Sequence, residues 1–211
     1  MPRIKVIGVG PGSEDYLTPA ARKALDAASA VVGGERHIRQ MAAPWQKTFI
    51  LKSNLGEALE FIRLHREAGV AVLASGDPGM YGILKYLRRH FRREDLEVIP
   101  GVSAVQLAFA RLAVPWEDAR ILSAHGRKVE GAFLAEAVRT SPKVAILTDP
   151  RCPPASIARM LAANGLAAQR IYCCCNLSYP DECVVETSAR ELLEKQIDLP
   201  PNCVVVILNE G

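Results

Sequence analysis

The sequence lacks an apolar run long enough to cross a bilayer, and it carries little net charge. None of its 211 residues lies in an apolar stretch near the roughly 20 residues that a membrane-spanning helix needs. The formal net charge of +3 is too small to indicate nucleic acid, although it suits a small anionic ligand. Strand-like sequence starts within three residues of the N-terminus, so we expect no signal peptide. The sequence therefore predicts a cytoplasmic protein that binds neither membrane nor nucleic acid.

Metal-binding cysteine motifs are also missing. The six cysteines include no CxxC pair, the pattern typical of zinc sites and thioredoxin-like redox centres. In a reducing compartment a disulfide framework is not expected. The run Cys173–Cys175 follows strand-like sequence and suits small buried side chains better than a chelating cluster. We therefore expect no metal site.

The glycine-rich segment Gly8–Ser13 matches no standard nucleotide motif. The dinucleotide fingerprint GxGxxG needs glycine where Ser13 stands, and Pro11 removes a phosphate-facing N–H. No Gly-Lys-Ser/Thr follows, which excludes a P-loop. The common methyl-donor fold needs an acidic residue before its glycines, but Val6 and Ile7 stand there. What remains is a glycine loop that lets a ligand approach the backbone.

The central stretch of the chain predicts a buried strand, a tight loop and a helix. Val70–Ala74 is a continuous apolar run, as in strands buried on both faces of a parallel sheet. The loop Ser75–Gly79 follows, and a new apolar pattern starts at Tyr81. Ligands of open α/β sheets bind beyond the carboxyl ends of strands, so this loop with its carboxylate, Asp77, is a candidate site. The same residues also suit an ordinary turn.

Apolar and charged fractions of 49% and 23% are those of a globular protein with one large or two small domains. Apolar runs and helical periodicity predict strands that alternate with helices. The expected strands are 3–7, 30–32, 70–74, 96–99, 120–123, 143–147, 170–175, 183–186 and 202–208, and the expected helices are 19–28, 55–67, 81–90, 104–112, 133–140, 156–163 and 189–195. The pattern breaks at Val114–Asp118. We expect an α/β fold with a parallel-sheet domain over 1–115 and a mixed-sheet domain over 116–211.

Several loops together resemble a known family. They are Val9–Gly12, Ser75–Pro78 with Tyr81-Gly82, Ile99–Ala104, Ser103–Leu112, Ser123–Arg127, Leu147–Pro150 and Asn176–Glu182. The first three, in this order, are similar to the signature loops of the tetrapyrrole (corrin and porphyrin) methyltransferases, and the resemblance covers essentially the whole chain. The last four stretches resemble the branch that methylates the C-5 meso carbon of a precorrin, cobalt-precorrin-7 or precorrin-6Y, in cobalamin biosynthesis.

The resemblance implies two α/β domains with a cleft between them, S-adenosyl-L-methionine in that cleft, and a homodimer. Carried over position by position, the donor contacts are Pro11, Gly76, Asp77, Pro78, Met80, Tyr81, Ser103, Ala104, Thr148, Asp149, Leu177 and Ser178.

The implied chemistry is an in-line displacement at the sulfonium methyl by a carbon of the macrocycle, which depends on positioning and needs no metal. His125 is the candidate general base because imidazole titrates near neutrality, although it also suits a structural role. Asp77, the other candidate catalytic residue, is expected to shape the donor loop and to contact the substrate, but not to transfer a proton. Arg36, Arg127 and Arg151 are expected to pair with acetate and propionate groups of the macrocycle, the alternative being solvated surface arginines.

Other readings remain open at this point. A relative acting at another ring carbon, a diphthamide-type methyltransferase that modifies a protein, and a non-catalytic tetrapyrrole-binding protein share parts of the pattern. The His-Gly-Arg and Tyr-Pro-Asp-Glu stretches favour the corrin branch. We expect one methylation without decarboxylation, and a separate decarboxylating C(15)-methyltransferase as a partner.

Overall fold

The computed structural model describes residues 1–126, 129–200 and 202–209, and the chain divides into two compact units, Met1–Ser103 and Ala104–Gly211. The expected boundary followed residue 115. The difference is the helix α5 (Ala104–Leu112), which packs against the last strand, β10 (Cys203–Leu208), and so belongs to the second unit.

The first unit is a five-stranded parallel sheet in the order β3-β2-β4-β1-β5. Its elements are β1 (Ile4–Gly8), α1 (Pro19–Asp26), β2 (Ala30–Gly33), α2 (Glu35–Met41), β3 (Lys47–Ile50), α3 (Leu55–His65), β4 (Val70–Ala74), α4 (Leu84–Leu87) and β5 (Leu96–Ile99). Every residue of β4 is buried. The parallel sheet predicted from the strand–loop–helix pattern is confirmed.

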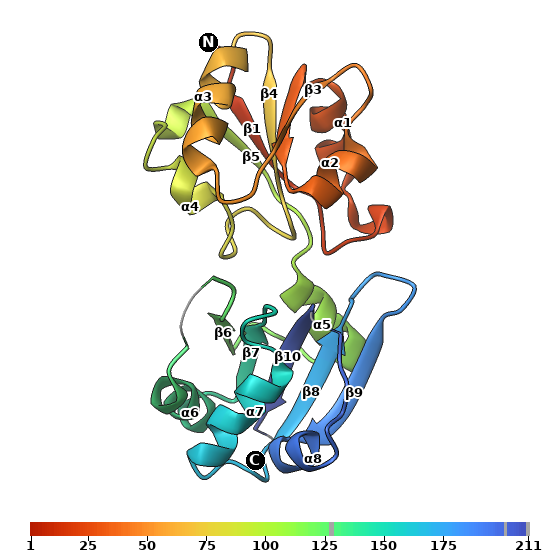
Figure 1. Ribbon diagram of the computed structural model, residues 1–211, viewed down its shortest axis with the longest axis vertical. Helices are drawn as coiled ribbons and strands as arrows, with labels where there is room; N and C mark the ends of the chain where they lie inside the picture. The colour runs from red at the N-terminus through yellow and green to blue at the C-terminus, as the bar shows by residue number, and fades with distance from the viewer. Residues whose placement is uncertain (127–128, 201, 210–211) are drawn as a thin grey trace. The chain divides into compact units, whose positions relative to one another are not determined.

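Two apolar clusters cover the two faces of this sheet, which Figure 1 shows with α3 and α4 on one side and α1 and α2 on the other. One cluster joins Val6 and Val72 to Ile62 of α3 and Leu87 of α4. The other cluster joins Ile7 to helices α1 and α2. Both faces of the central strands are therefore buried, which explains their continuous apolar sequence.

The second unit is a mixed sheet in the order β6-β7-β10-β8-β9. Its further elements are β6 (Ala119–Ser123), α6 (Gly131–Thr140), β7 (Lys143–Leu147), α7 (Pro154–Ala163), β8 (Arg170–Cys175), β9 (Cys183–Ser188) and α8 (Ala189–Glu194). β6 and β7 are parallel, whereas β10 runs antiparallel to both β7 and β8. The predicted mixed sheet is confirmed.

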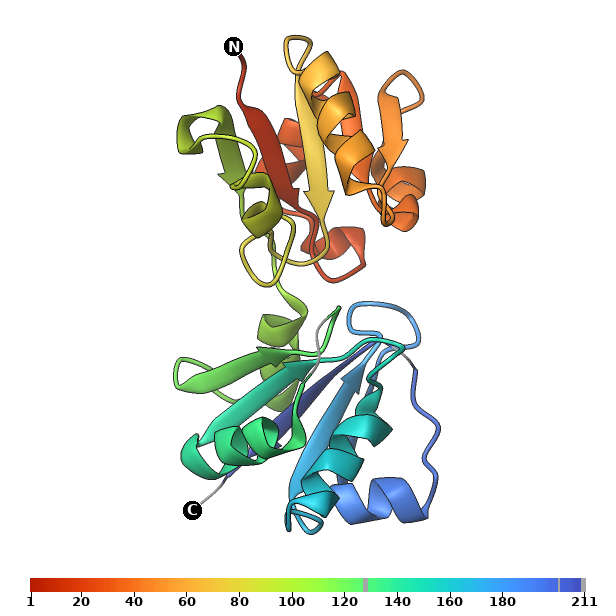
Figure 2. The same ribbon diagram turned by 60° about the vertical axis from the view of Figure 1, so that its left-hand side comes forward.

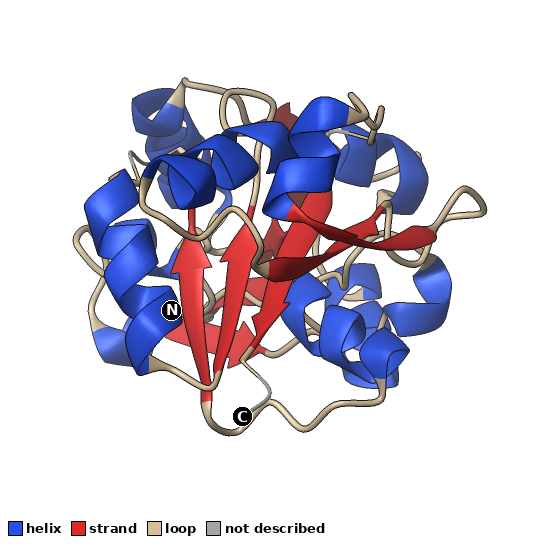
Figure 3. Cartoon of the chain, turned by 90° about the horizontal axis from the view of Figure 1, so that it is seen from below, coloured by secondary structure: helices blue, strands red, loops and turns tan. Residues whose placement is uncertain are grey.

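One large apolar cluster joins this sheet to α6, α7 and α8, which Figure 2 shows on the same face of the strands. Its largest fully buried side chains include Leu134, Ile146, Ile157, Leu161 and Leu192. In Figure 3 the helices, in blue, flank the strands, in red. Among the described residues, no helix is long and apolar enough to cross a membrane.

Two sequence expectations are corrected here. Cys175 and Cys203 form a disulfide, because they are register partners on the neighbouring strands β8 and β10. The predicted helix 81–90 is reduced to α4, because Tyr81 has a φ of 54°, outside the helical region, and the helix starts only at Leu84.

Candidate active site

The carboxyl edge of the first sheet gathers the predicted donor residues of that unit. β1, β4 and β5 are parallel neighbours, so the segments that follow them leave the sheet at one edge. These segments contain Pro11, Gly76, Asp77, Pro78, Met80, Tyr81 and Ser103. The topology therefore brings together residues up to 92 positions apart. Their contact with a donor stays a prediction.

Asp77 ties two of these segments to each other. Its Oδ1 accepts a hydrogen bond from the Gly79 N–H at 2.8 Å, and its Oδ2 accepts one from the Gly101 N–H at 3.2 Å. A carboxylate that accepts two backbone donors from different loops fixes both loops in one conformation. These bonds join the loop after β4 to the loop after β5, and the role of Asp77 in donor binding stays a prediction.

Glycines at this edge serve close packing of backbone. A Cβ on Gly101 would lie 2.3 Å from the Gly76 carbonyl oxygen, and a Cβ on Gly8 would lie 2.5 Å from the Gly101 nitrogen. Gly10 and Gly76 also exchange backbone hydrogen bonds at 2.8 and 3.3 Å. Neighbouring backbone at the ends of β1, β4 and β5 therefore leaves no room for a side chain at Gly8 or Gly101. The sequence had suggested instead that the glycines let a ligand approach the backbone.

Arg36 lies beyond β2 at the same carboxyl edge and is exposed. Its Nη2 lies 3.2 Å from Nε2 of His37, which is 8% exposed. Burial, and then the charge of Arg36, lowers the pKa of His37 to about 4. His37 is therefore neutral near pH 7 and accepts from Arg36, which orients the guanidinium. The predicted role of Arg36 in substrate binding stays a prediction.

The second unit places its candidate residues at one edge as well. β7 and β8 both run antiparallel to β10, and β6 is parallel to β7, so the carboxyl ends of β6, β7 and β8 meet there. Thr148, just after β7, donates from Oγ1 to the Cys203 carbonyl at 2.7 Å and accepts from the Cys203 N–H at 3.3 Å. The Thr148 hydroxyl thus fixes the end of β7 to the start of β10.

Asp149 organises two loops at this edge. Its carboxylate accepts from the N–H groups of Gly126, Arg151 and Cys152 at 2.9 to 3.0 Å. These bonds, the one from Gly126 foremost, lower the pKa of the carboxyl. The contacts make Asp149 a loop-fixing residue, comparable with Asp77 in the first unit. Its predicted contact with the donor stays a prediction.

The predicted catalytic and substrate-binding residues of this unit lie beside that carboxylate. His125 is exposed, and its backbone N–H donates to the Ser123 hydroxyl at 3.2 Å. Arg151 has a side chain 81% exposed, with Nη2 at 3.4 Å from Asp149. Arg127 lies outside the described residues. The structure thus brings His125 and Arg151 to loops held by one residue, Asp149.

The loop Asn176–Glu182 has an unusual backbone conformation on both sides of Leu177. Asn176 and Ser178 have φ values of 46° and 74°, a region that costs non-glycine residues about 1 kcal/mol or more each. Leu177 between them is buried. The Ser178 N–H donates to Oε2 of Glu182 at 2.6 Å. The loop therefore depends on its hydrogen bonds.

Two residues that the sequence analysis did not assign complete this arrangement. Arg111 of α5 donates from Nε to Oε1 of Glu182 and from Nη2 to Oε2 at 3.1 Å. The bond from Arg111, followed by the backbone bond from Ser178, lowers the pKa of Glu182. No spacing rule joins residues 71 positions apart, so the only sequence signal was that both stretches belong to the resemblance.

The donor set is suited to a cationic sulfonium ligand. Besides backbone groups, the predicted donor residues offer two carboxylates, Asp77 and Asp149, and apolar side chains of Pro11, Met80 and Leu177. They include no lysine or arginine, which would repel a sulfonium. The residues present therefore fit S-adenosylmethionine.

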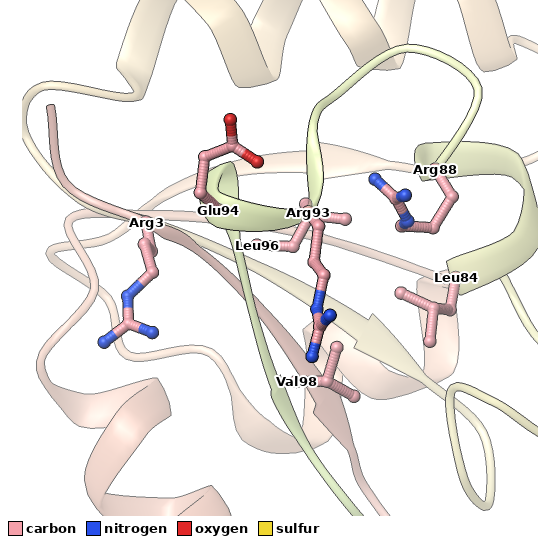
Figure 4. Close-up of a pocket in the computed structure, with 7 residues that line it drawn as sticks. All are labelled: Arg3, Leu84, Arg88, Arg93, Glu94, Leu96 and Val98. Atoms are coloured by element: carbon pink, nitrogen blue, oxygen red, sulfur yellow. The ribbon is translucent and has the colours of Figure 1, made fainter.

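A separate pocket lies beside the edge strand β5, near the start of β1 (Figure 4). It is lined by Arg3, Leu84, Arg88, Arg93, Glu94, Leu96 and Val98. None of the predicted site residues that the structure describes lines this pocket.

Comparison with known proteins identifies the family. The model of the tetrapyrrole (corrin/porphyrin) methylases matches residues 3–193. The chain belongs to this family. Its relatives are methyltransferases, and the chain is accordingly a methyltransferase that uses S-adenosylmethionine as methyl donor. The resemblance drawn from the signature loops is confirmed.

Three relatives bear names from cobalamin biosynthesis. The cobalt-precorrin-7 C(5)-methyltransferase of Salmonella typhimurium is 43% identical over 162 residues, which is 77% of this chain and 79% of that protein. The probable cobalt-precorrin-7 C(5)-methyltransferase of Methanocaldococcus jannaschii is 32% identical over 95% of this chain and 96% of that protein. A decarboxylating precorrin-6Y C(5,15)-methyltransferase of Sinorhizobium is 29% identical over 81% of this chain and 41% of that protein.

Solved structures show the same fold. A precorrin-6Y methylase of Archaeoglobus fulgidus superposes with a TM-score of 0.74 at 24% identity, covering 99% of this chain and 98% of that one. Uroporphyrin-III C-methyltransferase of Thermus thermophilus, complexed with S-adenosylhomocysteine, gives a TM-score of 0.76 at 20% identity, covering 98% and 97%.

Proposed function

We propose that this chain transfers the methyl group of S-adenosylmethionine to the C-5 meso carbon of a precorrin, cobalt-precorrin-7 or its metal-free counterpart. The observation that carries the proposal is the 43% identity to the Salmonella cobalt-precorrin-7 C(5)-methyltransferase over 162 residues. The M. jannaschii relative supports it over nearly the whole length of both chains.

The donor supplies an electrophilic methyl group on a cationic sulfur, and the loops of this chain position it. Asp77 holds the loops after β4 and β5 together, and Asp149 holds those after β6 and β7. Because the reaction needs neither a covalent intermediate on the protein nor a redox step, rate acceleration comes from fixing the approach of the two reactants and excluding water.

His125 is the proposed general base. Methylation of a meso carbon generates a ring that loses or relocates a proton, and an exposed imidazole on a loop fixed by Asp149 can receive it. Arg36 and Arg151, with Arg127, are the proposed partners of the substrate carboxylates, because a guanidinium binds a carboxylate through two parallel hydrogen bonds.

The test is an anaerobic incubation with S-adenosylmethionine carrying a labelled methyl group. Three acceptors are compared: cobalt-precorrin-7, the metal-free precorrin and a protein extract. The proposal predicts one methyl added to a precorrin and none to protein, without release of carbon dioxide. Label on protein alone would replace the proposal with a protein methyltransferase, and absence of donor binding in calorimetry would leave a tetrapyrrole-binding protein.

We further propose a cytoplasmic homodimer that works with a separate decarboxylating C(15)-methyltransferase. The relative from Sinorhizobium carries both C(5) and C(15) in its name, and this chain matches 41% of it. Light scattering coupled to gel filtration tests the dimer, and cell fractionation tests the location. When a C(15)-methyltransferase is added, it should release carbon dioxide only from the precorrin that this chain has already methylated.

A further inference from the structure

We propose that Glu182, held by Arg111, is a positioning residue for the methyl donor: it fixes the strained loop of Leu177 and Ser178 relative to the start of α5. The proposal deepens the donor site described above and rests on the proposed binding of S-adenosylmethionine there.

The loop around Leu177 has a backbone conformation that non-glycine residues rarely adopt. Two non-glycine residues, Asn176 and Ser178, have left-handed φ values on either side of the buried Leu177. Such a conformation persists only where surrounding contacts select it. The Ser178 N–H points to Glu182, at 2.6 Å from Oε2, so this carboxylate is a contact that selects it.

The carboxylate of Glu182 is itself held by Arg111. Arg111 donates to both oxygens of Glu182, the two-bond geometry that also fixes orientation. The Glu182 side chain is 18% exposed and that of Arg111 is 36% exposed, so water competes only in part for these bonds. The carboxylate therefore has a fixed position from which to hold the Ser178 N–H.

The Arg111–Glu182 pair connects two parts of the predicted donor site. α5 begins at Ala104, directly after Ser103, two of the predicted donor residues, and Arg111 lies two turns further along the same helix. The loop carries two others, Leu177 and Ser178. The Arg111–Glu182 pair therefore links α5 to the loop Asn176–Glu182 within the second unit. The helix begins at one part of the predicted donor site, and the loop forms another part.

Asn176 adds a second link inside the loop. Its side-chain Nδ2 donates to Asp181 at 2.6 Å, and its carbonyl accepts from the Tyr179 N–H at 3.0 Å. These bonds close the turn but leave the Ser178 N–H to Glu182. The loop is thus expected to keep its chain path when Glu182 is changed, while the Ser178 N–H loses this acceptor.

The experiment measures S-adenosylhomocysteine binding by calorimetry, and KM for the donor and kcat, in the full-length protein. Glu182→Ala is expected to weaken binding about tenfold and to raise KM far more than it lowers kcat. Glu182→Gln keeps an oxygen acceptor and should show a smaller loss. The double variant Arg111→Ala/Glu182→Ala should be no weaker than Glu182→Ala alone, because both residues act through one contact.

Arg170 and Glu186 provide the matched control. They form an ion pair between β8 and β9 of the same unit, with both side chains more than half exposed. Glu186→Ala should bind S-adenosylhomocysteine as the parent protein does. Melting temperatures of all variants are compared, and if Glu182→Ala does not fold, Glu182→Gln and Arg111→Lys decide.

The outcomes separate this inference from the donor site itself. Failure of the parent protein to bind S-adenosylhomocysteine would overturn the proposed function before any variant is compared. Tight binding by the parent and the control, together with unchanged binding in folded Glu182 and Arg111 variants, would overturn the positioning role alone. A loss matched by Glu186→Ala would also overturn it, because the effect would then be general.

Discussion

Asp77 joins the loops that follow β4 and β5 in the first unit. Its two oxygens accept from Gly79 and Gly101, at 2.8 and 3.2 Å. Asp77→Ala removes both bonds and should weaken S-adenosylhomocysteine binding by about 1–3 kcal/mol, roughly 5- to 150-fold. Asp77→Asn keeps one acceptor oxygen and should lose less. Calorimetry on both variants measures the difference.

Comparison of two ligands separates geometry from charge at Asp77. S-adenosylmethionine is a sulfonium cation, whereas S-adenosylhomocysteine has a neutral sulfur. If the carboxylate acts only by shaping the loop, Asp77→Ala lowers the affinity for both ligands by the same factor. A loss confined to the cation would instead assign a direct electrostatic contact. Parental affinity for both ligands in both variants would contradict either role.

His37 makes stability depend on pH. Its pKa is about 4 in the folded protein and 6.5 in an ordinary environment, so between these values the unfolded chain binds a proton that the folded chain does not. Stability contributed by neutral His37 is therefore complete above pH 6.5 and is lost as the pH falls to 4, by on the order of 3 kcal/mol. Urea unfolding of the parent protein and His37→Gln at a series of pH values measures this.

The expected result is a smaller decline for His37→Gln between pH 6.5 and 4. The exposed His90 provides the control, since His90→Gln should follow the parent curve. Parallel curves for the parent and His37→Gln would show that His37 does not contribute this pH dependence.

At the residue scale, sequence reasoning reached the roles that a single loop displays. Asp77 stands in a glycine-rich loop at a strand end, and its backbone bonds were predictable from that setting. Glu182 was not, because its significance comes from Arg111 on a helix 71 residues away. The helix α2, on which His37 lies, was missed because no periodic pattern marks it and its first residue follows a glycine without a side-chain cap.

At the element scale, the meeting of β1, β4 and β5 at three glycines is a requirement of packing. A Cβ on Gly101 would lie 2.3 Å from the carbonyl oxygen of Gly76 and 2.7 Å from the carbonyl carbon of Gly8, all backbone atoms that cannot move independently. Gly101→Ala should therefore destabilise the protein by about 1–3 kcal/mol, the usual range for overpacking. Urea unfolding checks the value.

Gly56 in α3 gives the opposite expectation. A Cβ there meets nothing within 4 Å, and glycine costs up to about 0.5–1 kcal/mol relative to alanine in a helix, the upper end applying to the helix middle and Gly56 lying in the first turn. Gly56→Ala should raise stability by up to that amount. If Gly101→Ala were as stable as the parent protein, that result would contradict the packing requirement at Gly101.

Strong apolar patterns predicted elements well, and weak ones did not. β4, β5, β7, β8 and α5 have the expected bounds because buried runs or helical periodicity mark them. β3 was missed because three of its four residues are exposed, so it has no apolar pattern. α4 starts later than expected because the left-handed Tyr81 precedes it, and a tyrosine gives no local signal for that conformation.

At the scale of the whole molecule, each unit has its own core and its own loop-bearing sheet edge. The first core lies on both faces of the parallel sheet, and the second joins the mixed sheet to α6, α7 and α8. The two-unit α/β organisation followed from strand–helix alternation. The assignment of α5 did not, because only its packing against β10 places it in the second unit.

The most direct test of the account is the position of the methyl group that this chain transfers. Cobalt-precorrin-7 is incubated anaerobically with the purified protein and S-adenosylmethionine labelled with carbon-13 in its methyl group, and the product is studied by NMR. We expect a single enriched methyl signal with a through-bond correlation to C-5, and no labelled methyl group on C-15. A labelled methyl on any other ring carbon would contradict it.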